Sequence, residues 1–342
     1  MKKRMFLLPF AAAVMIMTVK DAEATELRTA VSDALSSNNT VTNTTGILPA
    51  ADETYMNGVP VTTALPAATT PAVTTPAVTT PAATTPASAT PTATTPAAVK
   101  TVDLVIFAGQ SNMSGRGGNA RAAPKVANDT GYEFRYGSCA AGLYPVTEPF
   151  GIYSTGCLAD PPALRSGSLA SAFMNSYYVS CGVPVLGFSA ARGGSSIAYW
   201  QMPVIQSELS QKYDYILAWC KTNNVYIRKK YVVWLQGETD GVANVSKETY
   251  EMGLKSVFSR LFAKGLDRVF VIPIGKYAGL PGTYDKIRAA QIGLCKSDAR
   301  FTLGSDALGI LDETYLADGC HYNQAALNMA GSECGAAAAR MP

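Results

Sequence analysis

The sequence has few histidines and few charges, and each shortage excludes a class of function. His321 is the only histidine among 342 residues, so a metal site built from several histidines is impossible and any imidazole chemistry must use this residue. Only 15% of the residues are charged, and the net charge is +3. That charge is too small for an extended nucleic-acid-binding surface. We therefore expect no nucleic-acid partner.

Long apolar runs are also missing. The longest, residues 5–19, is shorter than the ~20 residues that a membrane-spanning helix needs. It follows three basic residues and precedes an A-E-A pattern at residues 22–24, so residues 1–24 are predicted to be a cleaved signal peptide of a secreted, extracellular protein. An uncleaved membrane anchor is the alternative.

The seven cysteines include no C-x-x-C pair, which argues against a zinc knuckle and a dithiol redox centre. All seven follow residue 100, and disulfides persist outside the cell. We expect two or three disulfides and at least one leftover thiol, with buried thiols as the alternative.

Two segments before residue 100 cannot form a hydrophobic core. Residues 25–65 are polar without sustained apolar periodicity, which predicts a disordered lead-in. Within residues 66–99 a proline recurs at every fifth position among Ala, Val and Thr, a pattern typical of an extended, O-glycosylated linker. N-x-S/T patterns at Asn38, Asn43, Asn128 and Asn244 further predict a glycoprotein.

Residues 100–342 have the composition of a globular domain that is large enough for one core. Continuous apolar runs predict strands buried on both faces, at residues 102–107, 183–188, 231–235 and 269–274. Apolar residues at helical spacing predict helices over residues 203–221 and 247–263. This alternation predicts a three-layer α/β/α sandwich around a parallel central sheet.

Ligands of such sheets bind beyond the carboxyl ends of the strands. Three of the runs are followed there by polar or glycine-rich blocks, G-Q-S-N-M at residues 109–113, A-R-G-G-S-S at 191–196 and Q-G-E-T-D at 236–240. A fourth block, D-G-C-H at residues 318–321, holds the only histidine. It is expected to lie at the start of one further helix near the C-terminus. We expect the four blocks to meet at one edge of the sheet.

These blocks contain the parts of a serine esterase. Ser111 is the candidate nucleophile, with a helix N-cap as its alternative role. His321 is the only imidazole that could take its proton, and Asp318 could orient the ring from three residues away. A backbone N–H of the glycine pair at 193–194 and the side chain of Gln236 could stabilise an oxyanion, unless they form an ordinary turn and a polar strand end.

The order and spacing of the blocks resemble the SGNH-hydrolase superfamily, in particular its branch of sialate O-acetylesterases and family 6 acetylxylan esterases. An R-A-A-Q segment at residues 288–291 adds to the resemblance, which covers about residues 102–335. It implies a flavodoxin-like fold and a triad of Ser111, His321 and Asp318, without metal or cofactor. It also implies an oxyanion hole from the N–H groups of Ser111 and Gly194 and the side chain of Gln236.

Some assignments within this resemblance stay open. In parts of the family a glutamate at the place of Glu238 is the histidine partner, so Glu238 is the candidate second carboxylate. Tyr199 and Trp200 follow the glycine block and could stack on a sugar or pack against the sheet. The resemblance does not separate acetylxylan from acetylated sialic acid as the substrate, and the sequence predicts no oligomeric state.

The sequence thus predicts a secreted carbohydrate O-acetylesterase whose partner is an acetylated glycan. Two rival interpretations exist. A non-catalytic carbohydrate-binding or surface-display protein would not need His321. A lipid or thioester hydrolase of the same superfamily is disfavoured, because no long apolar lid segment is present.

Overall fold

The computed structural model describes residues 99–341. The predicted signal peptide at 1–24, the lead-in at 25–65 and all but the last residue of the linker at 66–99 lie outside these residues. The boundary at residue 100 and the full-length domain plan therefore stay predictions.

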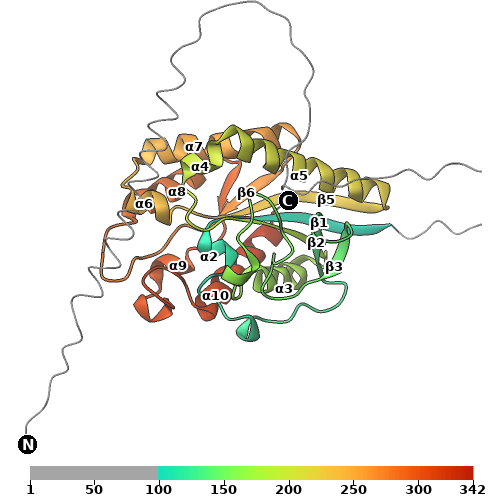
Figure 1. The fold of residues 1–342 in the computed structure, drawn as a ribbon, viewed down its shortest axis with the longest axis horizontal. Helices are drawn as coiled ribbons and strands as arrows, with labels where there is room; N and C mark the ends of the chain where they lie inside the picture. Colours follow the sequence, from blue (N-terminus) through green and yellow to red (C-terminus); the bar gives the residue numbers. More distant parts are fainter. Residues whose placement is uncertain (1–98, 342) are drawn as a thin grey trace, which may run out of the picture. The chain divides into compact units, whose positions relative to one another are not determined.

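Within residues 99–341 a single seven-stranded sheet forms the centre of the molecule, in the order β3-β2-β4-β1-β5-β6-β7 (Figure 1). All neighbouring strands are parallel except β2 and β3, which form an antiparallel edge. The strands are β1 (Lys100–Gly109), β2 (Gly131–Arg135), β3 (Gly142–Pro145), β4 (Val185–Ala191), β5 (Val225–Leu235), β6 (Arg268–Val271) and β7 (Phe301–Leu303).

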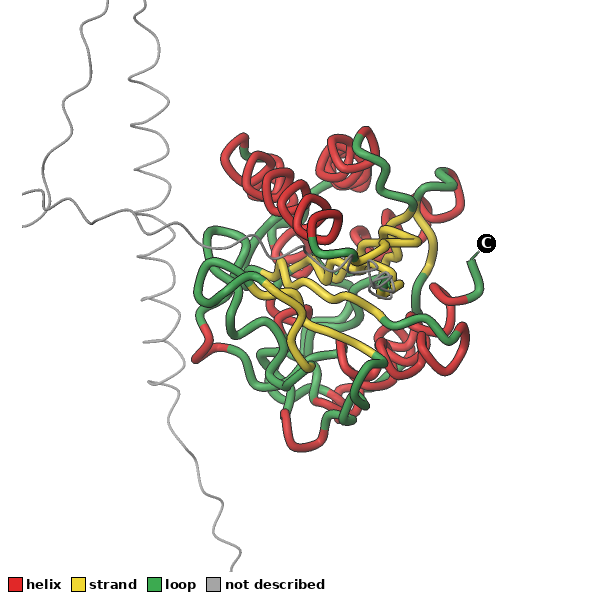
Figure 2. The backbone as a smooth tube through the Cα atoms, turned by 90° about the vertical axis from the view of Figure 1, so that its right-hand side faces the viewer, coloured by secondary structure: helices red, strands yellow, loops and turns green. Residues whose placement is uncertain are grey.

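Helices cover both faces of this sheet (Figures 1 and 2). One layer holds α3 (Ala170–Cys181) and α10 (Gln324–Ala339), which pack against each other. The other holds α5 (Pro203–Thr222), α7 (Lys247–Ala263) and α8 (Asp285–Ser297). The predicted three-layer α/β/α sandwich is confirmed. Among the described helices, none combines the length and apolarity needed to cross a bilayer.

The predicted elements can be compared with these bounds. The four predicted strands correspond to β1, β4, β5 and β6, and the two predicted helices to α5 and α7. All seven residues of β4 are buried, as are the last eight of β1, which explains their unbroken apolar character. Strands β2, β3 and β7 were not predicted, because each has only three to five residues and, unlike β6, none begins a longer apolar run.

Short elements connect the layers, and three of them carry the candidate residues Ser111, Tyr199, Trp200 and Glu238. They are the helices α2 (Ser111–Ser114), α4 (Ile197–Gln201), α6 (Glu238–Val242) and α9 (Ala307–Ile310), and the 3₁₀ turns Ala120–Ala122, Pro162–Leu164 and Glu313–Tyr315. Strand β1 lies between β4 and β5. After β1 the chain forms β2, β3 and β4 on one side of it, and then crosses to form β5, β6 and β7 on the other side. Parallel sheets form a ligand-binding crevice at such a reversal, and α2, α4 and α6 begin at or close behind the ends of these three strands.

Candidate active site

Ser111 is the first residue of α2 and is separated from the end of β1 by Gln110 alone. Gly109 makes this turn possible, because its φ is +152° and a Cβ there would lie 1.9 Å from the carbonyl oxygen of Leu235. Gln110 occupies the N-cap position, so the alternative role of Ser111 as the N-cap is wrong. Ser111 thus lies at the carboxyl end of β1, as the sequence predicted.

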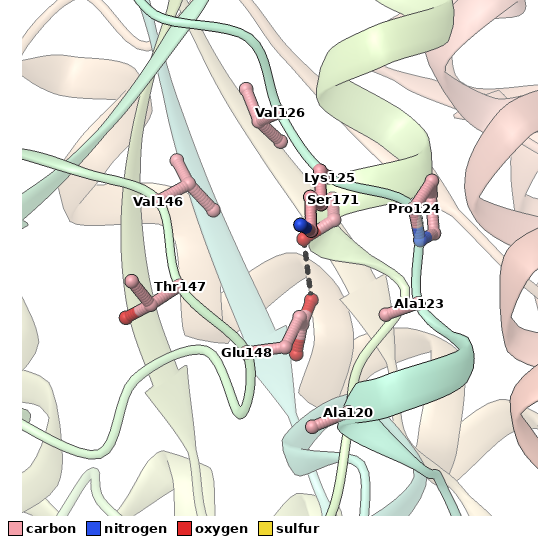
Figure 3. Close-up of a pocket in the computed structure, with 9 residues that line it drawn as sticks. All are labelled: Ala120, Ala123, Pro124, Lys125, Val126, Val146, Thr147, Glu148 and Ser171. Carbon is pink, nitrogen blue, oxygen red and sulfur yellow. Dashed lines mark hydrogen bonds between the residues drawn. The ribbon is translucent and has the colours of Figure 1, made fainter.

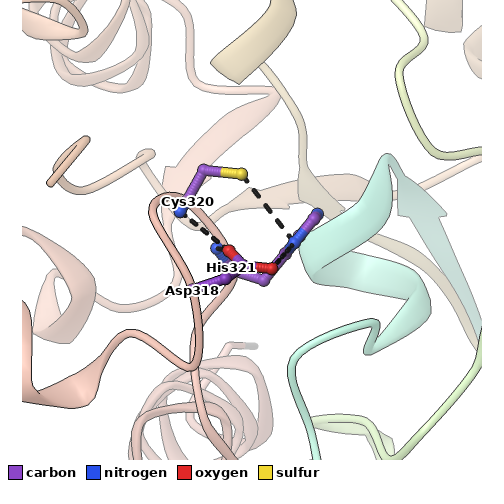
Figure 4. Close-up of side chains that lie close together, drawn as sticks. All are labelled: Asp318, Cys320 and His321. Carbon is purple, nitrogen blue, oxygen red and sulfur yellow. Dashed lines mark hydrogen bonds and ion pairs between the residues drawn. The ribbon is translucent and has the colours of Figure 1, made fainter. Parts of the chain in front are cut away.

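The D-G-C-H block forms a tight loop before α10 (Figure 4). The expectation that it starts the last helix is wrong, because α10 begins at Gln324. Asp318 Oδ1 accepts the backbone N–H groups of Cys320 and His321 at 2.9 and 2.8 Å. Its Oδ2 lies 2.7 Å from Nδ1 of His321. The predicted pairing of Asp318 with the imidazole is therefore present.

The ionisation of Asp318 follows from these contacts. Partial burial opposes the charge, but the N–H of Cys320 and the His321 side chain and N–H outweigh it and hold the pKa of Asp318 at about 2. The carboxylate is thus charged at any ordinary pH. A charged carboxylate favours a proton on Nδ1 and leaves the lone pair of the ring on Nε2.

Asn112 joins the serine turn to the histidine loop. Its Oδ1 accepts the N–H of Tyr322 at 2.9 Å, and its Nδ2 donates to the carbonyl oxygen of Cys320 at 3.0 Å. These bonds hold the residues on both sides of His321, and the side chain that makes them is the neighbour of Ser111. The sequence did not indicate this role of Asn112, because its bonding partner lies more than 200 residues away along the chain.

Gly194 lies in the exposed turn after β4, with a φ of +71° and open space where a Cβ would be. The buried carboxylate of Asp160 holds this turn, because Oδ1 accepts the N–H of Gly193 at 2.9 Å. Asp160 also accepts the Ser114 hydroxyl at 2.7 Å and a two-point bond from Arg116 at 2.8 and 2.9 Å. The acid thus ties the Gly194 turn to α2. Nothing in the sequence indicated this role, since Asp160 lies in a loop outside every block.

Gln236 is fully buried at the end of β5. Its amide donates to the carbonyl oxygen of Ser195 at 2.8 Å and to Oδ2 of Asp240 at 2.6 Å. Both amide hydrogens are occupied, so in this arrangement Gln236 has none to offer an oxyanion. The structure contradicts that part of the predicted oxyanion hole. The side chain instead holds the β4 and β5 loops together.

Glu238, the candidate second carboxylate, is buried next to the site at the start of α6. Its Oε1 accepts Asn112 Nδ2 at 2.6 Å, while its Oε2 is buried without a hydrogen-bond partner. Burial raises the pKa of Glu238, against the lowering effect of Asn112 and of the nearby His321. Asp318, rather than Glu238, makes the bond to Nδ1.

Trp200 takes the second of the two roles left open for it, packing against the sheet. Its side chain has no exposed surface and packs on Trp234, with 5.0 Å between the ring centroids. Its indole N–H donates to the Ser195 hydroxyl. Trp200 therefore belongs to the core rather than to a sugar-binding surface.

The cysteines, all within residues 99–341, form no disulfide in this structure, so the expected two or three disulfides are not present. The glycosylation patterns at Asn128 and Asn244 are exposed, while those at Asn38 and Asn43 lie outside the described residues.

Two pockets lie near these loops. One of about 350 Å³ lies between the Ala120–Ala122 turn and Glu148 (Figure 3), but that carboxylate already accepts bonds from Ser168 and Ser171. The other, of about 260 Å³, is lined by residues that include Tyr277 and Tyr284. The N–H of Ala278 donates to the carbonyl oxygen of Gly319 at 2.9 Å, so this second pocket adjoins the histidine loop.

Comparisons with known proteins show the family and the fold. A family model described as carbohydrate esterase, sialic acid-specific acetylesterase, matches residues 101–340. A protein of known structure from Arabidopsis thaliana is 21% identical, with a TM-score of 0.50, and the match covers 69% of this chain and 97% of that one. This likeness supports the fold.

Two further solved structures are similar at lower scores. A carbohydrate acetylesterase from Xanthomonas citri is 16% identical, with a TM-score of 0.37, over 58% of this chain and 49% of that one. A variant of an acetyl xylan esterase from Geobacillus stearothermophilus is 12% identical, with a TM-score of 0.38, over 69% and 96%. A search of curated proteins found no significant match.

Proposed function

We propose that this chain, which belongs to the carbohydrate esterase family of sialic acid-specific acetylesterases, removes O-acetyl groups from glycans of the acetylxylan or sialic-acid type. The family makes it a serine carboxylic ester hydrolase. The observation that carries the proposal is the 2.7 Å contact between Asp318 Oδ2 and His321 Nδ1, in a loop that Asn112 ties to the turn of Ser111.

In the proposed reaction the Ser111 hydroxyl attacks the acetyl carbonyl while Nε2 of His321 takes its proton. Asp318 keeps the ring in the required tautomer and stabilises the imidazolium that forms. The N–H groups of Ser111 and Gly194 are the proposed donors to the oxyanion. His321 then protonates the sugar alkoxide, and water releases acetate from the acyl-enzyme.

The pocket beside the histidine loop is the proposed place for the sugar. Tyr277 lies there partly exposed, and an aromatic ring offers the apolar face on which sugars stack. The buried Tyr284 supports it, with the two ring centroids 5.7 Å apart. This pocket replaces Trp200 as the candidate contact surface, since Trp200 is buried.

The nucleophile is tested with Ser111→Ala and His321→Ala in an acetate-release assay. Each should lower the rate by about a thousandfold or more with an unchanged circular dichroism spectrum, because the triad acts as a unit. Ser256→Ala, at an exposed serine of α7, is the matched control and should keep the full rate. Hydrolysis by the Ser111→Ala protein at the wild-type rate would remove Ser111 from the mechanism.

The substrate is tested by measuring acetate release from acetylated xylan, an acetylated sialoglycoconjugate and acetylated monosaccharides. The proposal requires release from at least one of the glycans. Ligand affinity that survives in His321→Ala, together with no acetate release by the wild type, would instead favour a carbohydrate-binding protein. A strong preference for long acyl chains would favour a lipid hydrolase.

We also propose that the protein is exported and that residues 25–99 set the reach of the domain without contributing to the chemistry. A chain that begins at Lys100 should hydrolyse a soluble acetyl ester at close to the full-length rate, while losing activity on a polymeric substrate. Loss of activity on the soluble ester would show that the boundary lies earlier.

A further inference from the structure

Cys320 is the side chain of the histidine loop that the proposed reaction does not use. Its Sγ lies 3.8 Å from Nδ1 of His321, on the ring edge that also faces Asp318 (Figure 4). The three ligand atoms, one from each residue, all lie within 4.8 Å of one another. In the described part of the chain this is the one group of three or more such side chains close enough to share a metal ion.

The separation between the sulfur of Cys320 and Nδ1 of His321 is close to that of two ligands in a tetrahedral zinc site. Zinc bonds of about 2.0–2.3 Å to sulfur, nitrogen and oxygen place neighbouring ligand atoms about 3.4–3.6 Å apart. The separation of 3.8 Å between Cys320 Sγ and His321 Nδ1 nearly meets this value. Nδ1 and Asp318 Oδ2 are 2.7 Å apart, so these two atoms must move apart for both to bind one ion.

The loop holds the ligands in place before any ion arrives. Asp318 Oδ1 keeps the N–H groups of Cys320 and His321, so Oδ2 alone turns toward an ion. The Asp318 side chain is 58% exposed, which gives an ion access from solvent.

We propose that Asp318, Cys320 and His321 form an inhibitory site for Zn²⁺. A thiolate, an imidazole and a carboxylate select zinc over the hard ions Mg²⁺ and Ca²⁺, which prefer oxygen ligands. Three protein ligands leave one position for water.

The ion and the reaction compete for the same atoms. Binding releases the thiol proton of Cys320 and places the metal on Nδ1 of His321. The neutral ring then carries its single proton on Nε2, which can no longer accept the proton of Ser111. Zinc also takes the carboxylate that orients the base. Inhibition therefore rests on the proposed function, whereas binding does not.

The inhibition is measured on the full chain in a phosphine reductant, with buffered free Zn²⁺ and a soluble acetyl ester. Free zinc at ten times its dissociation constant should lower the rate about tenfold, and a chelator should restore it, whereas Mg²⁺ and Ca²⁺ should have no effect. Measured against its own metal-free rate, Cys320→Ser should need at least about tenfold more zinc than the wild type for the same fractional inhibition. Cys157→Ser, at an exposed cysteine outside the cluster, is the matched control and should be inhibited like the wild type.

Binding is read separately by titrating Co²⁺ and recording the thiolate-to-cobalt charge-transfer absorption. The wild type and Cys157→Ser should show the band, and Cys320→Ser should not. Absence of the band in the wild type would overturn the site, as would zinc inhibition of Cys320→Ser equal to that of the wild type. If the protein hydrolyses no ester, the proposed function and the inhibition fail, while the cobalt band still decides whether the site exists.

Discussion

Two fully buried aspartates lie at opposite ends of the central strands of the sheet. Each accepts the same kinds of hydrogen bond, from an arginine at two points, from a hydroxyl and from a backbone N–H. Asp160, near the carboxyl ends, binds Arg116 at two points and accepts the Ser114 hydroxyl and the Gly193 N–H. Asp103, near the start of β1, binds Arg228 at 2.6 and 3.1 Å and accepts the Tyr177 hydroxyl and the Lys229 N–H. The local chemistry is therefore nearly identical.

What differs is the part of the molecule that each carboxylate joins. Asp103 links β1, β5 and α3, which are also held together by the sheet and the core. Asp160 links the α2 helix to the glycine turn, two short segments that carry candidate oxyanion donors. The same buried ion pair thus supports the fold at one end and the geometry of the site at the other. The following predictions test this contrast.

The largest effect is expected for Asp160→Asn, because it should lower both stability and rate. Breaking a buried pair while leaving its arginine in place costs about 3 kcal/mol. A shift of the Gly194 turn by about 1 Å would lower kcat about a hundredfold. Denaturant unfolding and the rate of ester hydrolysis at a temperature where the variant is folded measure the two effects. A folded variant with the wild-type kcat would contradict the role in the site.

The stability part should depend on pH in a defined direction. Burial opposes ionisation of Asp160, but its bonds from Arg116, Ser114 and Gly193 outweigh it and lower the pKa from 3.8. An acid with a lowered pKa in the folded state contributes stability above the ordinary value and loses it as the pH falls through the lowered one. The stability gap between the wild type and Asp160→Asn should be full at neutral pH and shrink below pH 3.8.

Asp103→Asn should lower stability by a similar amount, about 3 kcal/mol, and leave kcat unchanged. Its partner Arg228 remains 35% exposed, so water replaces part of the lost interaction. The measurements are those used for Asp160→Asn, made side by side. Equal losses of kcat in both variants would mean that the two ends of the sheet are not functionally distinct.

Asn112→Ala should lower kcat about tenfold to a hundredfold with a smaller loss of stability. The variant removes both bonds to the residues around His321 and the bond to Glu238, so the base is no longer held against the serine turn. Single-turnover kinetics with a soluble ester measures the loss. Asn328→Ala, at an amide whose oxygen and nitrogen bond to Gln324 and Ala122, is a control that should keep the rate.

The smallest effect is expected for Glu238→Gln, and it should be stabilising. Burial raises the pKa of Glu238, so the folded state holds its proton more tightly and loses stability as the pH rises through that pKa. Glutamine removes this loss, so Tm should rise at neutral pH, by about 2–4 °C for each kcal/mol gained, and change little below pH 4.5. A lower Tm at neutral pH would contradict the assignment of a destabilised carboxylate.

Much of the fold could be read from the sequence because its central strands are buried on both faces. Runs such as those of β1 and β4 are apolar without interruption, and α5 and α7 repeat their apolar residues at helical spacing. Strands β2 and β7 could not be read in this way, since they are short and β2 carries Glu133 and Arg135 within it. Their strand state depends on pairing with a neighbour.

Some contacts of the candidate site could likewise be predicted from the sequence, and others could not. The pairing of Asp318 with His321 is local, three residues apart, and a sequence pattern can indicate it. Gln236 shows the opposite case, because its residue type suited an oxyanion donor while the fold placed Ser195 and Asp240 around its amide. Residue type states which bonds a side chain can make, and only the neighbours decide which bonds it does make.

The sequence by itself determined the layered fold, the strand ends as the place for chemistry, and a single histidine with its nearby acid. These depend on burial patterns and short spacings, which a linear chain displays directly. Only the tertiary structure decided that Asn112 holds both neighbours of His321 and that Asp160 ties the glycine turn to α2. Such bonds join residues that are distant along the chain, and they form because burial leaves each polar group to find the partner that the fold brings to it.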